Sequence, residues 1–348
     1  MAYKLKIFFI KLRSWEYWPM WLVYFPLSFY YTYLAAKARS FFFFSASNPS
    51  IETGGMFFES KWSIFKLMPS HYYPTTIFIE PNNALYEIEA KLVAANIHFP
   101  IIAKPDRGER GWRVKKLHDV QELAKYKAET PVPFLIQSYV DYPVELSVFY
   151  YRYPFSAKGI VTSVTYKKLL SVVGDGFSTI EKLMLKNDRA FLQYKRLESE
   201  QQLNLQEVPA FGEERVLVPY GNHVLGTMFI NFNHIIDDEL TTAIDTISKN
   251  IEGFYFGRFD LRCASIEDLK QCKNFAILEL NGAGAEPAHI YHPGFSFIEA
   301  QKVLMQHFKM LFDAAEANHK VGIPYMSYHD YKQTKKLEKA FKQKVVQA

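Results

Sequence analysis

The chain has little cysteine, with only Cys263 and Cys272 among its 348 residues. A disulfide framework needs more cysteines than this, so the class of small disulfide-stapled secreted proteins is excluded. We expect both cysteines on neighbouring strands as buried thiols. Histidines are also sparse, and those in the C-terminal half do not have the spacing of a zinc motif; they are His223, His234, His289 and His292. His289 and His292 are expected to contact substrate or serve as a base, or to make structural hydrogen bonds.

Other familiar signals are missing as well. The 16 glycines form neither a Walker loop nor the glycine fingerprint of a dinucleotide-binding fold. No internal repeat or low-complexity linker divides the chain. The net charge of +5 is mild, so it does not indicate nucleic-acid binding. The length is ample for one bilobal domain with an appendage.

Two short pairs near the C-terminus are the most informative feature that is present. Arg258 and Asp260 flank a phenylalanine in one apolar run, and Glu279 and Asn281 flank a leucine in the next. Both runs are typical of β-strands, in which residues two apart point to the same face. Paired strands would therefore bring an arginine, two carboxylates and an amide together. Hard oxygen ligands suit Mg²⁺, and an arginine suits a transferring phosphoryl group; an ordinary edge strand is the alternative.

Upstream, an apolar strand ends at Lys104 and is followed by a loop rich in glycine and arginine. Its members are Arg107, Gly108, Arg110, Gly111 and Arg113. A lysine leaving a buried strand can hold a phosphate oxygen, and glycines let backbone N–H groups approach phosphates. A basic hairpin turn on a solvated face is the alternative interpretation.

Further polar positions follow in order along the chain. Residues 134–148 predict a strand, a polar linker and a second strand that opens at Glu145, with backbone and amide groups at residues 137–140 for an adenine edge. Lys167 and Lys168 end another strand. A Gly-Asp-Gly turn at residues 174–176 then leads to a helix capped by Ser178 or Thr179.

This order of motifs resembles the ATP-grasp superfamily, on its carboxylate–amine ligase branch. It is similar to D-alanine–D-alanine ligases and to the ATP-grasp module of cyanophycin synthetase, over about residues 75–310. The Val-Val-Gly-Asp-Gly turn at 172–176 and residues 221–227 resemble the cyanophycin-synthetase type. The resemblance implies an α+β fold in which two lobes clasp ATP between antiparallel sheets.

The resemblance also implies roles for named residues. Lys104 and one of Lys167 and Lys168 would contact ATP phosphates, and Glu145 would hold the ribose. Arg258 would steady the γ-phosphoryl group, so it and Lys104 are the expected catalytic residues. Mg²⁺, for which Mn²⁺ can substitute, would be bound by Asp260, Glu279 and Asn281. The remaining nucleotide-binding residues are Arg107, Gly108, Gly111, Gln137, Tyr139 and Val140.

The activity implied is an ADP-producing ligase that joins a carboxylate substrate to an amine acceptor through an acyl phosphate, often as a homodimer. A nucleotide-binding scaffold without catalysis and a phosphotransferase without ligation are the alternatives. The chain departs from the family in two places. Residues 48–98 are too short for the usual preceding domain, although the Gly54-Gly55 segment is a candidate substrate wall or an ordinary loop. The tail from Glu286 to His292 differs from D-alanine ligases, which puts that substrate in doubt.

An uncharged aromatic run at residues 17–36 has the length of a bilayer span but contains interfacial Trp and Tyr, and two prolines. Because ATP chemistry is cytoplasmic, one span would place four upstream basic residues outside, against the positive-inside rule. We therefore expect an in-plane or re-entrant anchor on the inner face of the cytoplasmic membrane, where a lipid or envelope precursor would be the substrate. A signal peptide, a core-buried helix and a dimer interface are the alternatives.

The expected organisation has four parts. Residues 1–47 form the membrane-associating segment, 48–98 the truncated preceding region, 99–320 the catalytic domain, and 321–348 a basic C-terminal helix. That last helix either touches anionic lipid or is solvated.

Overall fold

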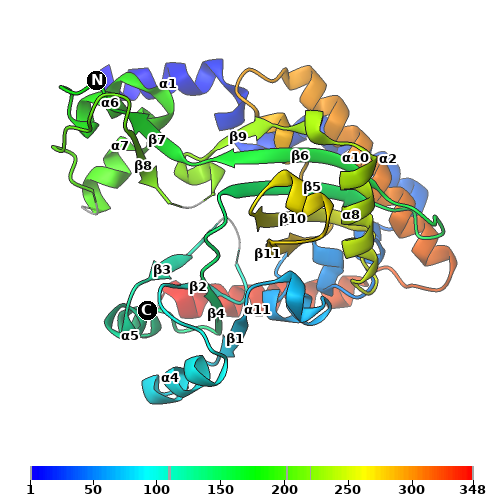
Figure 1. Ribbon diagram of the computed structural model, residues 1–348. Helices are drawn as coiled ribbons and strands as arrows, with labels where there is room; N and C mark the ends of the chain where they lie inside the picture. The colour runs from blue at the N-terminus through cyan, green and yellow to red at the C-terminus, as the bar shows by residue number, and fades with distance from the viewer. Residues whose placement is uncertain (1, 109–110, 201–202, 220, 347–348) are drawn as a thin grey trace.

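The computed structural model describes residues 2–108, 111–200, 203–219 and 221–346. Its strands form three sheets in which every pairing is antiparallel (Figure 1). The mixed helix and antiparallel-sheet architecture expected from the sequence is therefore confirmed. Two of the sheets matter for the candidate site, and they are called here the small sheet and the large sheet.

The small sheet has the order β1-β4-β2-β3 and is made of short strands. These are β1 Thr76–Ile79, β2 Ile101–Pro105, β3 Lys115–Leu117 and β4 Phe134–Ser138. Helices α4, Leu85–Ala94, and α5, Val120–Glu129, pack on it and share one apolar core with it. Because β1 pairs with β4, this lobe begins before residue 99, and it takes β1 and α4 from the region expected to precede it.

The large sheet has the order β11-β10-β5-β6-β9. Its strands are β5 Val144–Tyr151, β6 Ile160–Lys168, β9 Met228–Asn231, β10 Phe256–Cys263 and β11 Phe275–Asn281. Helix α8, Asp238–Lys249, covers one face, with α9, Ile266–Lys270, beside it. The 24-residue helix α10, Phe297–Lys320, packs on the other face, where His307 meets Phe149 of β5.

A small unit projects from the large sheet, at the upper left of Figure 1. It consists of β7 Leu170–Val173, β8 Glu214–Val218, and helices α6 Ile180–Lys186 and α7 Asp188–Glu200. Thr179 accepts a hydrogen bond from the Lys182 N–H and so caps α6, as one of the two expected caps. These elements enclose a core of their own, against which Tyr3 packs.

The N-terminal segment forms helices α1, Ala2–Arg13, and α2, Met20–Ala38, followed by a short turn at Phe43–Ala46. Val23 and Leu27 of α2 are buried with Leu304 of α10, and the Phe43–Ala46 turn packs against the same long helix. Among the described residues, no helix combines the length and apolarity that crossing a bilayer requires.

The basic C-terminal helix is α11, Tyr328–Val346, and it is docked along much of its length. Tyr331 stacks on Phe42 at 5.0 Å between ring centroids, and Phe341 lies 5.5 Å from Phe58 and 6.1 Å from Trp112. Trp112 belongs to the loop after β2. The helix therefore joins the N-terminal segment to the Gly/Arg loop, which neither of the two sequence interpretations anticipated.

Candidate functional site

Strand alternation decides which face of the large sheet carries the candidate site. Tyr150 of β5 donates to Asp245 of α8, so the even-numbered residues of β5 near it face α8. Ser147 lies on the opposite face and is the cross-strand partner of Asp260, which in turn is paired with Glu279. Arg258 and Asn281 are likewise partners in the β10–β11 register. The four residues predicted from the sequence therefore share the face away from α8.

Asp260 is the centre of this face. One of its carboxylate oxygens accepts hydrogen bonds from Arg258 at 3.1 Å and Asn281 at 3.0 Å. The other accepts from the Ser147 hydroxyl and lies 3.1 Å from Nζ of Lys167. Burial opposes the charge of Asp260, but Arg258 and Lys167 outweigh it and hold the pKa of the carboxyl well below its usual value. Asp260 is thus a fixed, buried anion.

Lys167 and Lys168 point to opposite faces of β6, as neighbours on a strand must. Lys167 is buried, 3.5 Å from Glu145 and 3.1 Å from Asp260. Burial acts to lower its pKa, but the two carboxylates outweigh burial and raise it. Lys168 is about half exposed and lies 3.9 Å from Glu214 of β8. One of these two lysines was expected to contact phosphates; the structure brings Lys167 to Asp260, whereas Lys168 lies on the other face beside Glu214.

Lys104 reaches the large sheet from the small one. Its ammonium donates to the Leu278 carbonyl of β11 at 2.8 Å, beside Glu279. Burial lowers the pKa of Lys104 to about 8, although the Glu279 carboxylate partly opposes this. Lys61, at the start of helix α3, Lys61–Lys66, is a second cation here, 3.6 Å from Glu279 and bonded to the Gly108 carbonyl. Glu279 therefore lies between two lysines.

The segment around Gly54 and Gly55 packs against the loop that follows Asn281, and we call it the glycine wall. The Ala283 and Gly284 amides donate to the carbonyls of Gly54 and Gly55, at 2.9 and 2.8 Å. At Gly55 an added Cβ would lie 2.7 Å from Cα of Gly282, so the two backbones approach as closely as glycine permits. Asn48 secures the wall, because its side chain bonds both the Gly54 carbonyl and the backbone of Phe256.

The Gly/Arg loop lies next to this wall. Arg107 makes a two-pronged ion pair with Glu52, and Gly108 receives the Lys61 ammonium. Gly111 has a positive φ of 71°, and an added Cβ there would meet the Asn222 side chain at 2.4 Å. Arg110 lies outside the described residues. The loop thus contacts Lys61 through a backbone carbonyl, and Arg107 is paired with Glu52.

The expected adenine and ribose residues are partly engaged within the protein. Gln137 is buried and donates to Thr76 on β1, so its side chain stabilises the small sheet. The Val140 carbonyl accepts from Arg262, which also pairs with Glu145 at 2.9 Å. Tyr139 stacks under Lys116 at 3.6 Å. Arg262 was missed from the sequence, although its place two residues after Asp260 puts it on the same strand face.

A second cluster adjoins Arg258. Arg258 donates to the Glu286 carbonyl at 3.1 Å, and the Glu286 carboxylate accepts hydrogen bonds from Tyr291, at 2.6 Å, and from Tyr24 of α2. Burial, followed by the Glu286 charge, raises the pKa of Tyr24 well above its usual range. An N-terminal helix therefore supplies a side chain to the edge of the site, which no sequence signal indicated.

The histidines and cysteines have structural surroundings. His289 contacts the Ser163 hydroxyl at 2.7 Å, and burial lowers its pKa to about 4, so it is neutral at pH 7. His292 accepts from the Asn231 amide at 3.2 Å. Cys263 is buried on β10, and burial raises its pKa to about 12. Cys272 lies in the turn before β11, so its expected place on a strand was wrong.

The donor atoms around Asp260 are of the kind that would bind a nucleotide together with Mg²⁺. Asp260, Glu279 and Asn281 offer hard oxygen atoms on one face, which is the donor chemistry that Mg²⁺ prefers. Within the described ranges, no group of three or more His, Cys, Asp or Glu side chains is placed to hold a metal, so Asn281 and the ligand's own oxygens would complete the set. The buried Nε of Arg258 has no hydrogen-bond partner among the described residues, and a phosphoryl oxygen would satisfy it.

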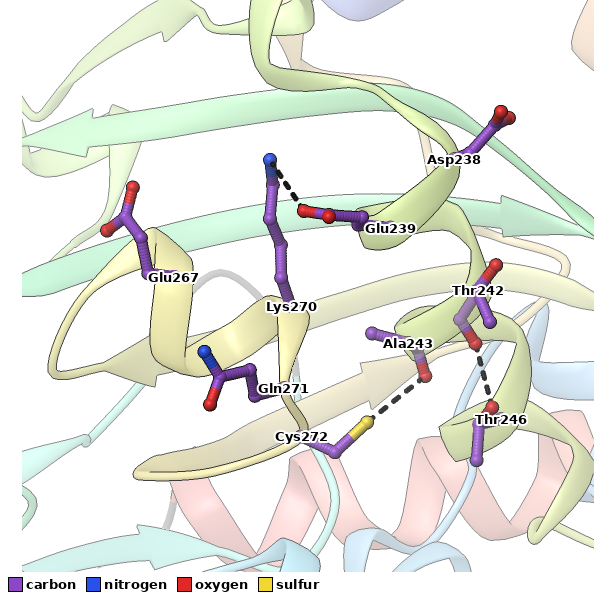
Figure 2. A pocket seen from close by; sticks show the side chains of 9 residues that line it. All are labelled: Asp238, Glu239, Thr242, Ala243, Thr246, Glu267, Lys270, Gln271 and Cys272. Carbon is purple, nitrogen blue, oxygen red and sulfur yellow. Dashed lines mark hydrogen bonds and ion pairs between the residues drawn. The ribbon is translucent and has the colours of Figure 1, made fainter.

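A hollow between α8 and α9 is not part of this site. Figure 2 shows its lining, in which Lys270 pairs with Glu239 at 3.8 Å and the Cys272 thiol contacts the Ala243 carbonyl. Because α8 covers the face of the large sheet opposite Asp260, the hollow is separated from the site by the sheet. Its polar groups are explained by helix packing.

Comparisons with known proteins give distant structural likenesses. No family model matches the chain, and no curated protein matches it in sequence. Among solved structures, VanG D-Ala:D-Ser ligase from Enterococcus faecalis is 15% identical with a TM-score of 0.41, over 74% of this chain and 62% of its own. D-alanine–D-alanine ligase from Bacillus anthracis is 14% identical with a TM-score of 0.40, over 75% and 67%.

A bifunctional glutathione synthetase from Pasteurella multocida is 15% identical with a TM-score of 0.38, over 72% of this chain and 36% of its own. The chain thus spans about a third to two thirds of the length of these proteins. D-alanine–D-alanine ligase, an enzyme that the order of motifs resembles, is among these structures.

Proposed function

We propose that the protein is an ATP- and Mg²⁺-dependent ligase that joins a carboxylate to an amine through an acyl phosphate. The observation that carries this proposal is the buried cluster around Asp260, where Arg258, Lys167 and Asn281 converge on one carboxylate. Lys104 reaches the same place from the other lobe. A protein that only binds nucleotide has little use for so much buried, compensated charge.

The proposed ligase reaction has two steps. A carboxylate oxygen of the substrate attacks the γ-phosphorus, the bond to the bridging oxygen breaks, and ADP leaves. The amine nitrogen then attacks the acyl carbon, the C–O bond to phosphate breaks, inorganic phosphate leaves, and the nitrogen loses a proton to solvent. Phosphorylation supplies the leaving group that a carboxylate lacks.

The protein's part is positioning and charge compensation. Arg258, with one buried donor unsatisfied, would hold the transferring phosphoryl group, and Lys104 and Lys167 would hold phosphate oxygens. Mg²⁺, held by Asp260, Glu279 and Asn281, would supply neutralisation of the phosphate charge. The Gly54-Gly55 wall would keep the backbone of the 282–285 loop in place beside the acyl group.

The proposed location and substrates are supported by the N-terminal segment. The exposed aromatic side chains of residues 1–47 and their basic neighbours support a place at the inner face of the cytoplasmic membrane. A lipid or an envelope precursor would then carry the acid or the amine. A homodimer is part of the same proposal, since ligases of the kind that the motifs resemble are often dimers.

The test is ADP release by the full chain with Mg²⁺, a panel of carboxylic acids and hydroxylamine, which traps an acyl phosphate as a hydroxamate. Glu279→Gln serves as the inactive variant and Glu200→Gln, an exposed residue at the end of α7, as its matched control. We expect hydroxamate that depends on ATP and Glu279. ADP release without hydroxamate would indicate a phosphotransferase, and ATP binding without turnover on any acid would indicate a scaffold.

A further inference from the structure

Helices α1 and α2 carry an apolar surface that nothing in the described protein covers. On α1, Leu5, Phe8, Phe9 and Leu12 follow one another at helical spacing and are all about half exposed. On α2, Trp21, Phe25 and Phe29 recur every fourth residue and are 70%, 60% and 68% exposed. Tyr33 and Phe41 extend this row. We call these side chains the aromatic face.

The aromatic face is the outer side of helices whose inner side is folded into the protein. Val23, Leu27, Leu34 and Ala35 of α2 are buried, the first two with Leu304 of α10 and the other two with Phe312. Gln301 also donates to the Val23 carbonyl at 3.0 Å. Helix α2 is therefore packed along α10 (Figure 1). The apolar side chains on its outer side remain exposed to water in the folded protein.

Positive charge borders the aromatic face. At 3.6 residues per turn, Lys4 and Lys11 lie along one edge of the apolar stripe of α1, and Arg13 lies along the other. All three are exposed, as are Lys37 and Arg39 at the end of α2. No acidic residue occurs in α1 or α2, so this charge is not compensated within the two helices.

From these observations we infer that the aromatic face docks in the plane of a bilayer that contains anionic lipids. Apolar side chains would enter the headgroup boundary while the flanking ammonium and guanidinium groups contact lipid phosphates. Basic edges favour a negatively charged partner over a second copy of this same basic surface, which would repel itself. The inference deepens the membrane location in the proposed function and stands whether or not the ligase chemistry is correct.

The docked helix also contacts the candidate site directly. Tyr24 lies between the exposed Trp21 and Phe25 in sequence, yet its hydroxyl donates to Glu286, whose carbonyl accepts from Arg258. Tyr24, on the inner side of α2, is therefore linked to Arg258 through Glu286. A substrate held in the bilayer would have a short path to the reacting groups.

The experiment is flotation of the full chain with vesicles of phosphatidylcholine alone or mixed with phosphatidylglycerol. We expect binding to the mixed vesicles that weakens with salt. A Phe25→Ser/Phe29→Ser variant should bind at least about tenfold more weakly, given the apolar area lost. The matched control is Phe177→Ser/Phe211→Ser, which removes two side chains that are 75% and 87% exposed on the projecting unit, and it should bind as the native chain does.

The depth of Trp21 in the bilayer is measured by quenching of tryptophan fluorescence with lipids that are brominated at shallow or deep positions. The Trp21→Phe variant gives the signal of the other tryptophans, so that the Trp21 signal can be isolated. Stronger quenching by the shallow label fits in-plane docking, and stronger quenching by the deep label would overturn it. Failure to float with either vesicle would also overturn the inference. So would a lipid-free dimer that the Phe25/Phe29 variant dissociates, because the face would then be a protein interface.

Discussion

At the scale of single residues, the site depends on which side of a strand each charged group occupies. Lys167 and Lys168 are adjacent and chemically identical, yet one is buried between two carboxylates and the other faces solvent near Glu214. The cost of burying Asp260 and Glu145 is offset by cations that the same strands supply. The residue type alone therefore does not show whether a side chain reaches the site; the strand face on which the residue lies decides it.

This pair gives the first prediction. Lys167→Met should lower ATP turnover by about two to three orders of magnitude, because it removes a fixed charge from the phosphoryl site. Lys168→Met should stay within about twofold of the native protein. ADP release checks both. Lys167→Arg should recover stability in a thermal melt, and equal losses from the two Met variants would contradict the assignment.

The second prediction concerns pH at Lys104, whose pKa burial lowers to about 8. Below that pH the ammonium is charged and holds phosphate; above it the amine becomes neutral, so the KM for ATP should rise as pH passes 8. Folding stability should rise with pH above about 8, because there the unfolded chain still binds this proton and the folded protein has released it. In Lys104→Arg the rise in KM should disappear, and a rise that persists would assign it to another group.

At the scale of elements, two glycine segments far apart in the chain hold the site together. Directly after β11, the amides of the 282–285 loop donate backbone hydrogen bonds to the carbonyls of the Gly54-Gly55 turn. Helix α11 completes the arrangement from outside, since Phe341 packs on Phe58 and on Trp112 of the Gly/Arg loop. The residues assigned by sequence to a truncated region thus pack directly against the loop that follows β11.

Gly55→Ala tests this element. Its φ of +78° is strained for alanine, and the added methyl would lie 2.7 Å from Gly282, so we expect a loss of about 2–4 kcal/mol and of most activity. Gly294→Ala is the matched control, with a φ of +83° and open space around it, and should lose only about 1 kcal/mol. Urea denaturation measures both. Equal losses would show that backbone strain, and not the contact with Gly282, explains the effect.

At the scale of the whole molecule, the N-terminal segment joins parts that are distant in sequence. Glu16 accepts hydrogen bonds from Arg189 of α7 at 2.6 Å and from His223 at 3.0 Å, and it is buried. Tyr3 and Lys6 of α1 contact the same projecting unit. Deleting residues 1–47 would therefore remove side chains that pack against α10 and against the projecting unit. Substitutions on the aromatic face leave this packing intact, so they are the better test of membrane association.

Glu16→Gln should release the projecting unit. We expect faster amide exchange in α6 and α7, with the small sheet unchanged, and Glu213→Gln as an exposed control without effect. Burial opposes the charge of Glu16, but the His223 and Arg189 contacts lower its pKa below 4.5. Its contribution is therefore present above pH 4.5 and lost as the pH falls through the lowered value. Exchange in α6 and α7 that the substitution leaves unchanged would contradict this role.

The strands, and the face that Arg258, Asp260, Glu279 and Asn281 share, could be predicted from the sequence, because a period of two is a local property of the backbone. The sequence also indicated Lys104 and the mixed antiparallel architecture. Three features became visible only in the folded protein: the separation of Lys167 from Lys168, the contact of Tyr24 with Glu286, and the packing of Gly54-Gly55 against the 282–285 loop. These features depend on contacts between residues that are up to a few hundred positions apart in the chain. A local sequence pattern does not specify which distant segments will come into contact.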